Sequence, residues 1–151
     1  IQREKMKTEL IKIGKPTTQE SRALVDTYLI RTRVLDPIEG LEYKDIEMLK
    51  SKARNLFSPG QWVVALDERG KEWSSPELSH QFKKWLENPA IKSVVFLIGG
   101  PYGLDDELRG KANVVWSLSK GTLPSDLAWV IAAEQIYRAF TILKGMPYHH
   151  A

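Results

Sequence analysis

The sequence predicts an α/β protein with a mostly parallel sheet and helices on both faces. Two nearly continuous apolar runs, Trp62–Leu66 and Ser93–Ile98, have the composition of strands buried on both sides. Segments with amphipathic helical spacing alternate with strand patterns along the chain, and this alternation is typical of parallel layered folds. The 151 residues are expected to form a single domain, residues 1–151, with a core that needs no disulfide or metal.

The first part of the chain contains one further strand pattern and two helix patterns. Thr8–Ile13 alternates between apolar and polar residues and is predicted to be a strand. Gln19–Ile30 and Lys44–Phe57 carry apolar residues near helical spacing. Ser58-Pro59-Gly60 is expected to end the second of these helices.

The second part begins with a helix that is expected to run from Ser75 to about Leu86. Ser75 is predicted to be its N-cap, with a proline in its first turn. Asn113–Leu118 is predicted to be a short strand. Leu127–Leu143 is the longest predicted helix, and Lys144-Gly145 is expected to close it.

Composition limits the classes of function. The chain has no cysteine and three histidines, so thiolate chemistry is excluded and a metal centre is not expected. No apolar run approaches the roughly 18 residues of a membrane span, and the polar N-terminus lacks a secretory signal. We therefore expect a cytoplasmic protein without metal and without a membrane partner.

Positive charge is concentrated near the N-terminus. The net charge is +3, and residues 1–33 hold eight basic against four acidic residues. Such an excess suits RNA phosphates, although many small proteins show it without binding nucleic acid. The basic residues are Arg3, Lys5, Lys7, Lys12, Lys15, Arg22, Arg31 and Arg33.

Three loops are candidates for ligand binding, because ligands of parallel sheets lie beyond the carboxyl ends of the strands. They are Asp67–Trp73, Gly99–Gly103 and Ser119–Ser125. In the second loop, glycines could admit a nucleotide, with Pro101 stiffening the turn, or could serve only a tight turn; by itself the loop favours the turn.

The segment from Ser117 to Pro124 alternates small or polar residues with leucine. It could offer backbone hydrogen bonds to an adenine edge while Leu118 and Leu123 cover the ring faces. The alternative is an ordinary connection that ends in the helix cap Ser125.

The long helix combines an apolar surface with one charged pair. Apolar residues occupy two sides of it, so it is expected to be buried in a core or at a subunit interface, which Trp129 would mark. Glu134 and Arg138 have the favourable i,i+4 order. This pair is either a structural ion pair or part of a substrate site, and structure is the default.

Taken together, several separated motifs resemble one family, the ribosomal RNA large-subunit pseudouridine N3-methyltransferases of the SPOUT class. The resemblance is dense from Trp62 to the C-terminus. It is carried by the segments Phe96–Leu104, Trp116–Pro124, Ala133–Phe140 and Pro147–His149. Family members usually begin at a Met-Lys that corresponds to Met6-Lys7, so residues 1–5 are expected to be an added remnant or an extension. The second strand, between Ile30 and Lys44, is expected to be short, and Tyr102 stands where the family is more polar.

The resemblance implies a C-terminal trefoil knot, an obligate homodimer, and S-adenosyl-L-methionine as cofactor. The long helix is apolar on too much of its circumference for one small sheet to cover, so we expect it to form most of the dimer interface. It further implies that the substrate is a pseudouridine of 23S ribosomal RNA, in the decoding-centre hairpin of assembled ribosomes. The positions that match cofactor contacts are Leu66, Gly99, Leu118, Ser119, Lys120, Gly121, Thr122 and Leu123.

The catalytic residues expected on the nucleoside side are Arg138, Tyr148 and His149. Pseudouridine N3 must lose a proton, and His149 has the side chain best suited to accept it. Arg138 could stabilise the anionic ring or hold a phosphate. Lys120 and the N-terminal basic residues are expected to hold the RNA backbone.

Two other functions remain open at this point. One is a SPOUT methyltransferase that acts on another RNA, such as transfer RNA. The other is a ribosome-associated protein that has this fold but no catalytic turnover. Cofactor binding separates the second function from both enzymes, and a panel of RNA substrates separates the two enzymes.

Overall fold

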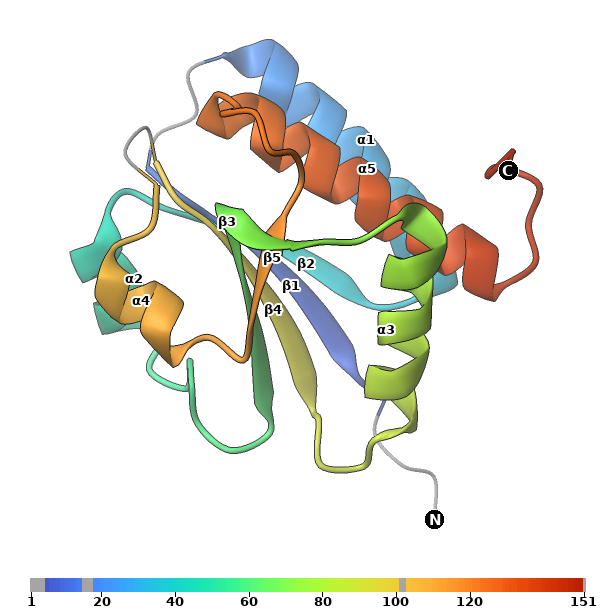
Figure 1. Cartoon of the computed structure of the whole chain (residues 1–151), viewed down its shortest axis with the longest axis horizontal. Helices are drawn as coiled ribbons and strands as arrows, with labels where there is room; N and C mark the ends of the chain where they lie inside the picture. The colour runs from blue at the N-terminus through green and yellow to red at the C-terminus, as the bar shows by residue number, and fades with distance from the viewer. Residues whose placement is uncertain (1–4, 15–17, 101–102, 151) are drawn as a thin grey trace.

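The computed structural model describes residues 5–14, 18–100 and 103–150. It consists of one five-stranded sheet with helices on both faces (Figure 1). The elements in chain order are β1 (Lys7–Ile13), α1 (Gln19–Leu35), β2 (Ile38–Tyr43), α2 (Ile46–Lys52), β3 (Gln61–Glu72), α3 (Ser75–Glu87), β4 (Ser93–Ile98), α4 (Asp106–Lys111), β5 (Val114–Ser117) and α5 (Ser125–Leu143).

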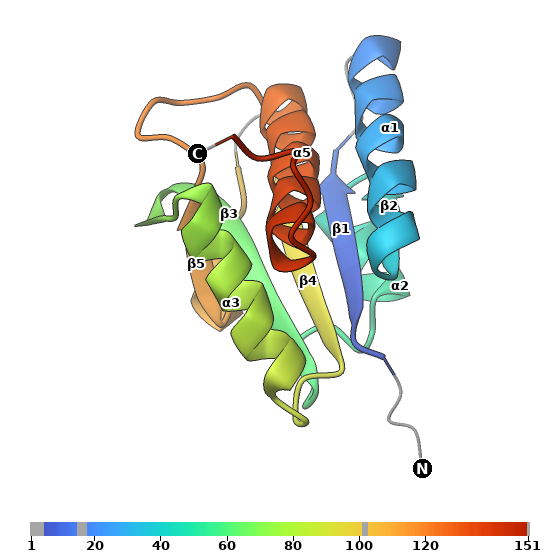
Figure 2. The ribbon, with the colours of Figure 1, turned by 90° about the vertical axis from the view of Figure 1, so that its right-hand side faces the viewer.

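The strands lie in the order β2-β1-β4-β3-β5, and every pair is parallel. Helices α1, α5 and α3 cover one face, with α5 lying between the other two (Figure 2). Helices α2 and α4 cover the opposite face (Figure 1). The predicted α/β class, the parallel sheet and the helices on both faces are therefore confirmed. The trefoil knot stays a prediction, and so does the single-domain assignment.

Each face of the sheet has its own apolar core. Beneath α1, α3 and α5, a cluster of aromatic residues surrounds Phe82, whose ring lies 4.6 Å from Phe140 and 5.1 Å from Trp85, measured between ring centroids. Beneath α2 and α4, a smaller cluster includes Leu49 and Leu108. Strand β4 contributes to both cores and is fully buried from Val94 to Leu97, which explains its continuous apolar sequence.

Helix α2 is shorter than predicted, and the prediction of Lys44–Phe57 was wrong at both ends. Asp45 is the N-cap, since its side chain accepts a hydrogen bond from the Met48 N–H at 2.8 Å. At the far end, Ala53 is the C-cap and leaves the helical conformation, with ψ of 60°. The residues after it form turns, in which Ser58 donates its N–H to the carbonyl of Asn55 and Phe57 has a left-handed φ of 70°. Helix α1, in contrast, continues five residues beyond the predicted end.

Other boundaries differ where local hydrogen bonds outweigh the sequence pattern. Ser74, not Ser75, caps α3, because Ser74 and Glu77 form a reciprocal capping box. Ser75 instead donates its hydroxyl to the Gln135 side chain of α5 at 2.7 Å. Ser125 is the first residue of α5 rather than its cap. Helix α4 was not predicted, and β2, expected to be short, pairs with β1 over six positions.

Candidate active site

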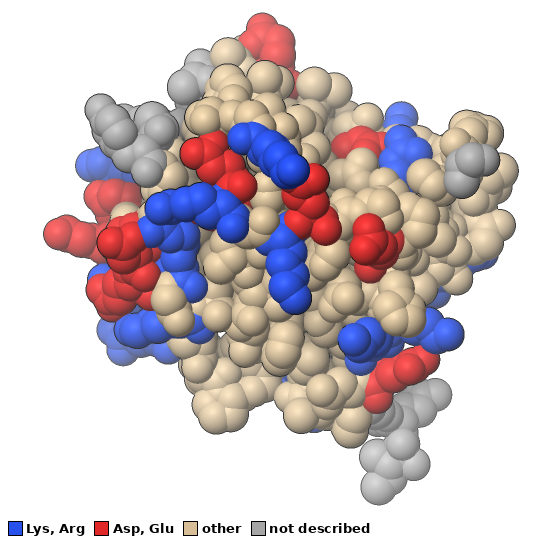
Figure 3. Space-filling view, viewed as in Figure 1, with Lys and Arg blue, Asp and Glu red and all other residues tan. Residues whose placement is uncertain are grey.

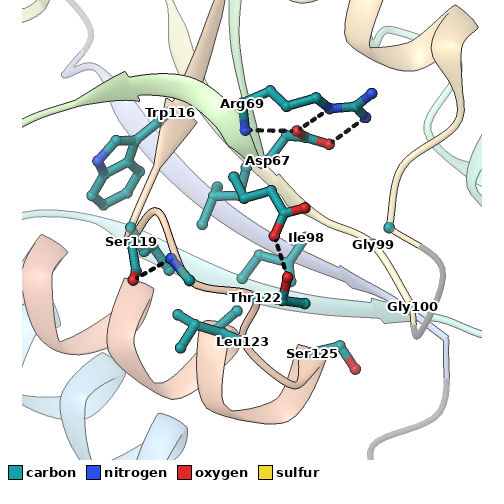
Figure 4. Close-up of a pocket in the computed structure, with 16 residues that line it drawn as sticks. Asp67, Arg69, Ile98, Gly99, Gly100, Trp116, Ser119, Thr122, Leu123 and Ser125 are labelled. Atoms are coloured by element: carbon teal, nitrogen blue, oxygen red, sulfur yellow. Dashed lines mark hydrogen bonds and ion pairs between the residues drawn. The ribbon is translucent and has the colours of Figure 1, made fainter.

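A cavity of about 290 Å³ opens at the carboxyl ends of the strands (Figure 4). Its wall combines the end of β3, the end of β4, the loop after β5 and the first turn of α5. All three loops selected from the sequence contribute to it. This is the position that the topology of a parallel sheet assigns to a ligand.

The β3 wall of the cavity depends on an interruption in strand pairing. Strand β3 continues to Glu72, so the prediction that Asp67–Trp73 is a loop was wrong for most of its length. Its pairing with β5 shifts between Leu66 and Lys71. The intervening residues leave the regular ladder, and Asp67, Glu68 and Arg69 line the cavity.

Gly70 allows β3 to return to β5 after this interruption. A Cβ at Gly70 would lie 2.4 Å from the carbonyl oxygen of Val115, which belongs to the neighbouring strand. Only glycine fits such a close approach of two backbones. The side chains at residues 67–69 are therefore held at the cavity by a local backbone requirement.

Asp67 is the most strongly held charge at the cavity. Its carboxylate accepts hydrogen bonds from the Arg69 guanidinium at 2.8 and 3.0 Å, and Arg109 of α4 approaches it at 3.3 Å. The hydrogen bonds from Arg69 lower the pKa of Asp67 to about 2, against the opposing effect of burial. Asp67 therefore links β3 to α4 as a permanent anion.

We expect Asp67→Asn to lower stability near neutral pH by on the order of 1 kcal/mol, a value reduced because Arg69 is largely exposed. The folded-state pKa lies below the value of about 3.9 for an unfolded aspartate. The stabilisation is thus complete above pH 4 and is lost as the pH falls towards 2. Urea unfolding at pH 7, 4 and 3 should show a smaller acid-induced loss in the variant. Glu87→Gln, at the end of α3, is the control; equal acid sensitivity of Asp67→Asn and the wild type would contradict the assignment.

Gly99 lines the cavity, but its lack of a side chain is required first by the backbone of its own loop. A Cβ at Gly99 would lie 2.4 Å from the carbonyl carbon of Gly103 and 2.7 Å from the Leu104 nitrogen. Replacing it with valine therefore deforms the loop backbone before any ligand is present. Gly99→Val is therefore expected to disturb the fold of the loop as well as any ligand binding, so it is not a clean test of the cavity. Pro101 and Tyr102, in the same loop, lie outside the described residues.

The loop after β5 is fixed by its own side chains. Ser117 donates its hydroxyl to the carbonyl of Ser119 at 2.8 Å, and Ser119 accepts the Gly121 N–H at 3.0 Å. The hydroxyl of Thr122 donates to Glu68 across the cavity at 2.6 Å, a bond that Figure 4 draws from Thr122. Backbone groups of this loop are thereby held in place beside the cavity.

Seven of the eight predicted cofactor positions line this one cavity: Leu66, Gly99, Leu118, Ser119, Gly121, Thr122 and Leu123. Lys120 is exposed and does not line it. Sequence reasoning selected the loops around Asp67 and Ser125 but did not identify Trp116 or Ala128. Trp116 is almost fully buried, and its ring contributes to the wall (Figure 4). A tryptophan in a short strand is more often a core residue, so nothing in the sequence around Trp116 indicates that it lines a ligand cavity.

The three predicted catalytic residues meet in a second cluster, at the C-terminal part of α5. Arg138 binds the Glu134 carboxylate through Nη2 at 2.8 Å, and its Nη1 lies 3.1 Å from His149 Nδ1. The Tyr148 hydroxyl donates to Glu134 at 2.7 Å, while the Arg138 guanidinium lies 4.6 Å above the Tyr148 ring. The C-terminal tail is therefore folded back onto α5.

In this cluster Glu134 is held as a carboxylate and Tyr148 as a neutral phenol. Burial opposes ionisation of Glu134, but hydrogen bonds from Arg138 and Tyr148 outweigh it and lower the pKa of that carboxyl. Burial, and then the hydrogen bond to Glu134, raise the pKa of Tyr148 well above its usual value. Tyr148 is thus a hydrogen-bond donor and not a phenolate. Arg138 is held by a carboxylate and still has donors free for His149 or a ligand.

Within one chain the cluster and the cavity lie far apart. Ala128 is the last residue of α5 that lines the cavity, and Arg138 follows ten positions later on the same helix. At 1.5 Å per residue this separates them by about 15 Å along the axis. One subunit alone does not bring the predicted catalytic residues to the predicted cofactor residues.

Several of the N-terminal basic residues that the structure describes are paired with acidic residues, and Figure 3 shows basic and acidic side chains next to one another on the face that it draws. Lys12 is fully buried, so the expectation that it binds RNA was wrong. Lys5 pairs with Asp36, Lys7 with Glu39, and Arg22 with Glu42. Arg3 and Lys15 lie outside the described residues. Within the chain segments that are described, no cluster of three or more metal-binding side chains occurs, and no helix is long and apolar enough to cross a bilayer.

Residues 6–149 match the family model described as "Predicted SPOUT methyltransferase". The chain belongs to this family. The match includes β1 through α5, the cavity and the tail cluster, so the resemblance identified from the motifs is confirmed.

Several relatives of this SPOUT methyltransferase share the name "Ribosomal RNA large subunit methyltransferase H". "Ribosomal RNA large subunit methyltransferase H" of Gloeobacter violaceus is 36% identical and aligns over 96% of this chain and 99% of its own length. The protein of the same name from Maridesulfovibrio salexigens is 50% identical over 94 residues, 62% of this chain and 60% of its own. In fold, the chain is similar to the crystal structure of a probable methyltransferase from Bordetella pertussis, with a TM-score of 0.57 and 11% identity, over 89% of this chain and 95% of the other.

Proposed function

We propose that this SPOUT methyltransferase uses S-adenosyl-L-methionine to methylate N3 of a pseudouridine in 23S ribosomal RNA, in the decoding-centre hairpin of assembled ribosomes. The observation that carries the proposal is the alignment, over 96% of the chain, with a relative named as a large-subunit ribosomal RNA methyltransferase. The pseudouridine and its hairpin are what the family resemblance of the loops implies. The protein would accordingly act in the cytoplasm.

The cavity suits an adenosine-bearing cofactor. Leu66, Leu118 and Leu123 supply apolar walls, while the fixed loop after β5 supplies backbone groups. Its volume lies near the lower end of small-molecule pockets, which run from roughly 300 to 1,000 Å³. When bound, the cofactor supplies an electrophilic methyl group. The residues of the chain hold it in line with the nucleophile and keep water away.

The tail cluster supports the nucleoside side of the reaction. Proton removal from pseudouridine N3 leaves negative charge on the uracil ring. The Arg138 guanidinium is held by Glu134 and can donate to that charge. His149 Nδ1 lies 3.1 Å from Arg138 Nη1, and because a guanidinium can only donate, Nδ1 is the acceptor and Nε2 carries the ring proton. His149 can therefore accept the N3 proton only at Nδ1, once Arg138 turns its donor to the substrate.

A homodimer would unite the two sites, because the tail of one subunit could cover the cavity of the other. Helices α1 and α5 lie side by side (Figure 2). Both helices expose apolar side chains to solvent. Leu127 is 51% exposed, Ile30 60% and Val34 83%. Exposed apolar groups on neighbouring helices are typical of a subunit interface.

The purified protein should bind S-adenosyl-L-methionine without added metal and methylate ribosomes from a strain that lacks the modification. Calorimetry measures binding, and mapping of the modified base identifies the product. Gly121→Val should weaken binding at least tenfold (about 1.4 kcal/mol), because Gly121 lines the cavity. The nearest atom to a Cβ there is Ser119 Oγ at 3.5 Å, so the backbone tolerates the change.

Gly110→Val is the matched control, since its Cβ meets no atom within 4 Å and Gly110 does not line the cavity. A folded protein that binds neither the cofactor nor its demethylated product would support a ribosome-associated protein without turnover. A protein that binds the cofactor but methylates only transfer RNA would move the assignment to another RNA.

A further inference from the structure

We propose that Glu68 makes the cavity selective for the positively charged methyl donor over its neutral demethylated product. This inference rests on the proposed cofactor. In the reaction, the sulfur–methyl bond breaks as the bond from carbon to N3 forms, and the N3 proton leaves to a base or to water. Sulfur keeps the electron pair, so the ligand in the cavity loses one positive charge.

The acidic groups of the cavity are not equivalent. Asp67 is neutralised by the guanidinium groups of Arg69 and Arg109. Glu68 lines the same cavity and accepts a hydrogen bond from the uncharged hydroxyl of Thr122 at 2.6 Å. Arg69 interacts with the charge of Glu68 at longer range, but its guanidinium is bound to Asp67. Among the described lining residues, Glu68 is therefore the carboxylate that no guanidinium binds, and its charge is available to a ligand.

The position of this charge is fixed. Glu68 belongs to the interrupted part of β3, and Gly70 holds that backbone against β5. Thr122 fixes the carboxylate from the opposite loop. Because Glu68 lines the cavity, a positive charge bound there lies close to this carboxylate, whose field salt screens over about 8 Å at physiological ionic strength.

The expected magnitude is modest because the Glu68 side chain is exposed to solvent. A cationic ligand should gain about five- to tenfold in affinity from the carboxylate, whereas a neutral ligand should gain little. The consequence for turnover is faster release of the product, since the attraction ends with methyl transfer. If Glu68 served only to link β3 to the loop after β5 through Thr122, its loss would change the affinities of the methyl donor and of the demethylated product by the same factor.

The test compares three ligands on wild-type protein and Glu68→Gln by calorimetry. They are S-adenosyl-L-methionine, its demethylated product, and an analogue with an ammonium group in place of the sulfonium. Glutamine keeps an acceptor for Thr122. We expect both cationic ligands to bind Glu68→Gln about five- to tenfold more weakly, with less than a twofold change for the product.

Thr122→Val is the matched control, because it removes the hydrogen bond and leaves the charge. It should change the affinities of all three ligands by similar factors. Equal weakening of the three ligands in Glu68→Gln, or no weakening, would overturn the proposal while leaving the methyltransferase assignment intact. Failure of the wild type to bind any of the three would instead contradict the proposed function.

Discussion

Arg138→Ala is expected to lower the rate of ribosome methylation by about 10²–10³-fold while cofactor affinity stays within about twofold. Arg138 lies about 15 Å along α5 from Ala128, the nearest residue of that helix that lines the cavity of its own subunit, so its loss leaves that cavity unchanged. Its Nη1 lies beside His149, and its Nε and Nη2 bind Glu134. Removing Arg138 takes away the positive charge that we expect to stabilise the negative charge developing on the uracil ring. Single-turnover methylation and calorimetric binding separate the two effects.

Arg138→Lys is the control for this result. Lysine keeps the charge but cannot form the forked contact with Glu134, so only part of the rate should return. His149→Ala tests the proton acceptor through the rate measured from pH 6 to 9. A wild-type rate across that range would exclude His149 as the base and leave the methyltransferase assignment in place. Wild-type activity of Arg138→Ala would remove the tail cluster from the reaction.

The sheet could be predicted from the sequence because its central strands are buried on both faces. Val63, Val64, Val94 and Val95 are fully buried, and a run of this kind has few alternatives. The order of the strands could not be predicted, since the pairing of β1 between β2 and β4 leaves no local pattern in the chain. The capping box at Ser74 was present in the sequence but was assigned one residue late.

The cavity was partly predictable because loops at the carboxyl ends of parallel strands converge. The sequence motifs around Gly99 and Leu118 could therefore be assigned to one ligand site before the structure was known. The roles of Asp67 and Glu68 could not be predicted from the sequence. Both residues lie within strand β3, and they line the cavity because the pairing of β3 with β5 shifts its register between Leu66 and Lys71. Nor could the sequence show that Gly99 serves the loop backbone at Gly103.

Trp129→Glu is expected to abolish folding, and it cannot report on the subunit interface. Trp129 is only 3% exposed and belongs to the core beneath α1, α3 and α5, so its expected place at an interface was wrong. Replacing a buried tryptophan costs about 3–5 kcal/mol, and burying a carboxylate without a partner adds to this. The sum approaches the whole stability of a small domain, about 5–15 kcal/mol. Circular dichroism should show an unfolded or insoluble protein.

Leu127→Glu is the variant that tests the interface. Leu127 lies two positions before Trp129 on α5 but is 51% exposed, so the change leaves the core intact. We expect a folded protein whose mass by light scattering falls from that of a dimer to 17.2 kDa, the mass of one chain. Met48→Glu, on the opposite face of the sheet and 38% exposed, should leave the dimer unchanged. A wild-type protein that is monomeric at micromolar concentrations would refute the dimer. The tail cluster would then have to reach the cavity by a path within its own subunit, against a separation of about 15 Å along α5 between Ala128 and Arg138.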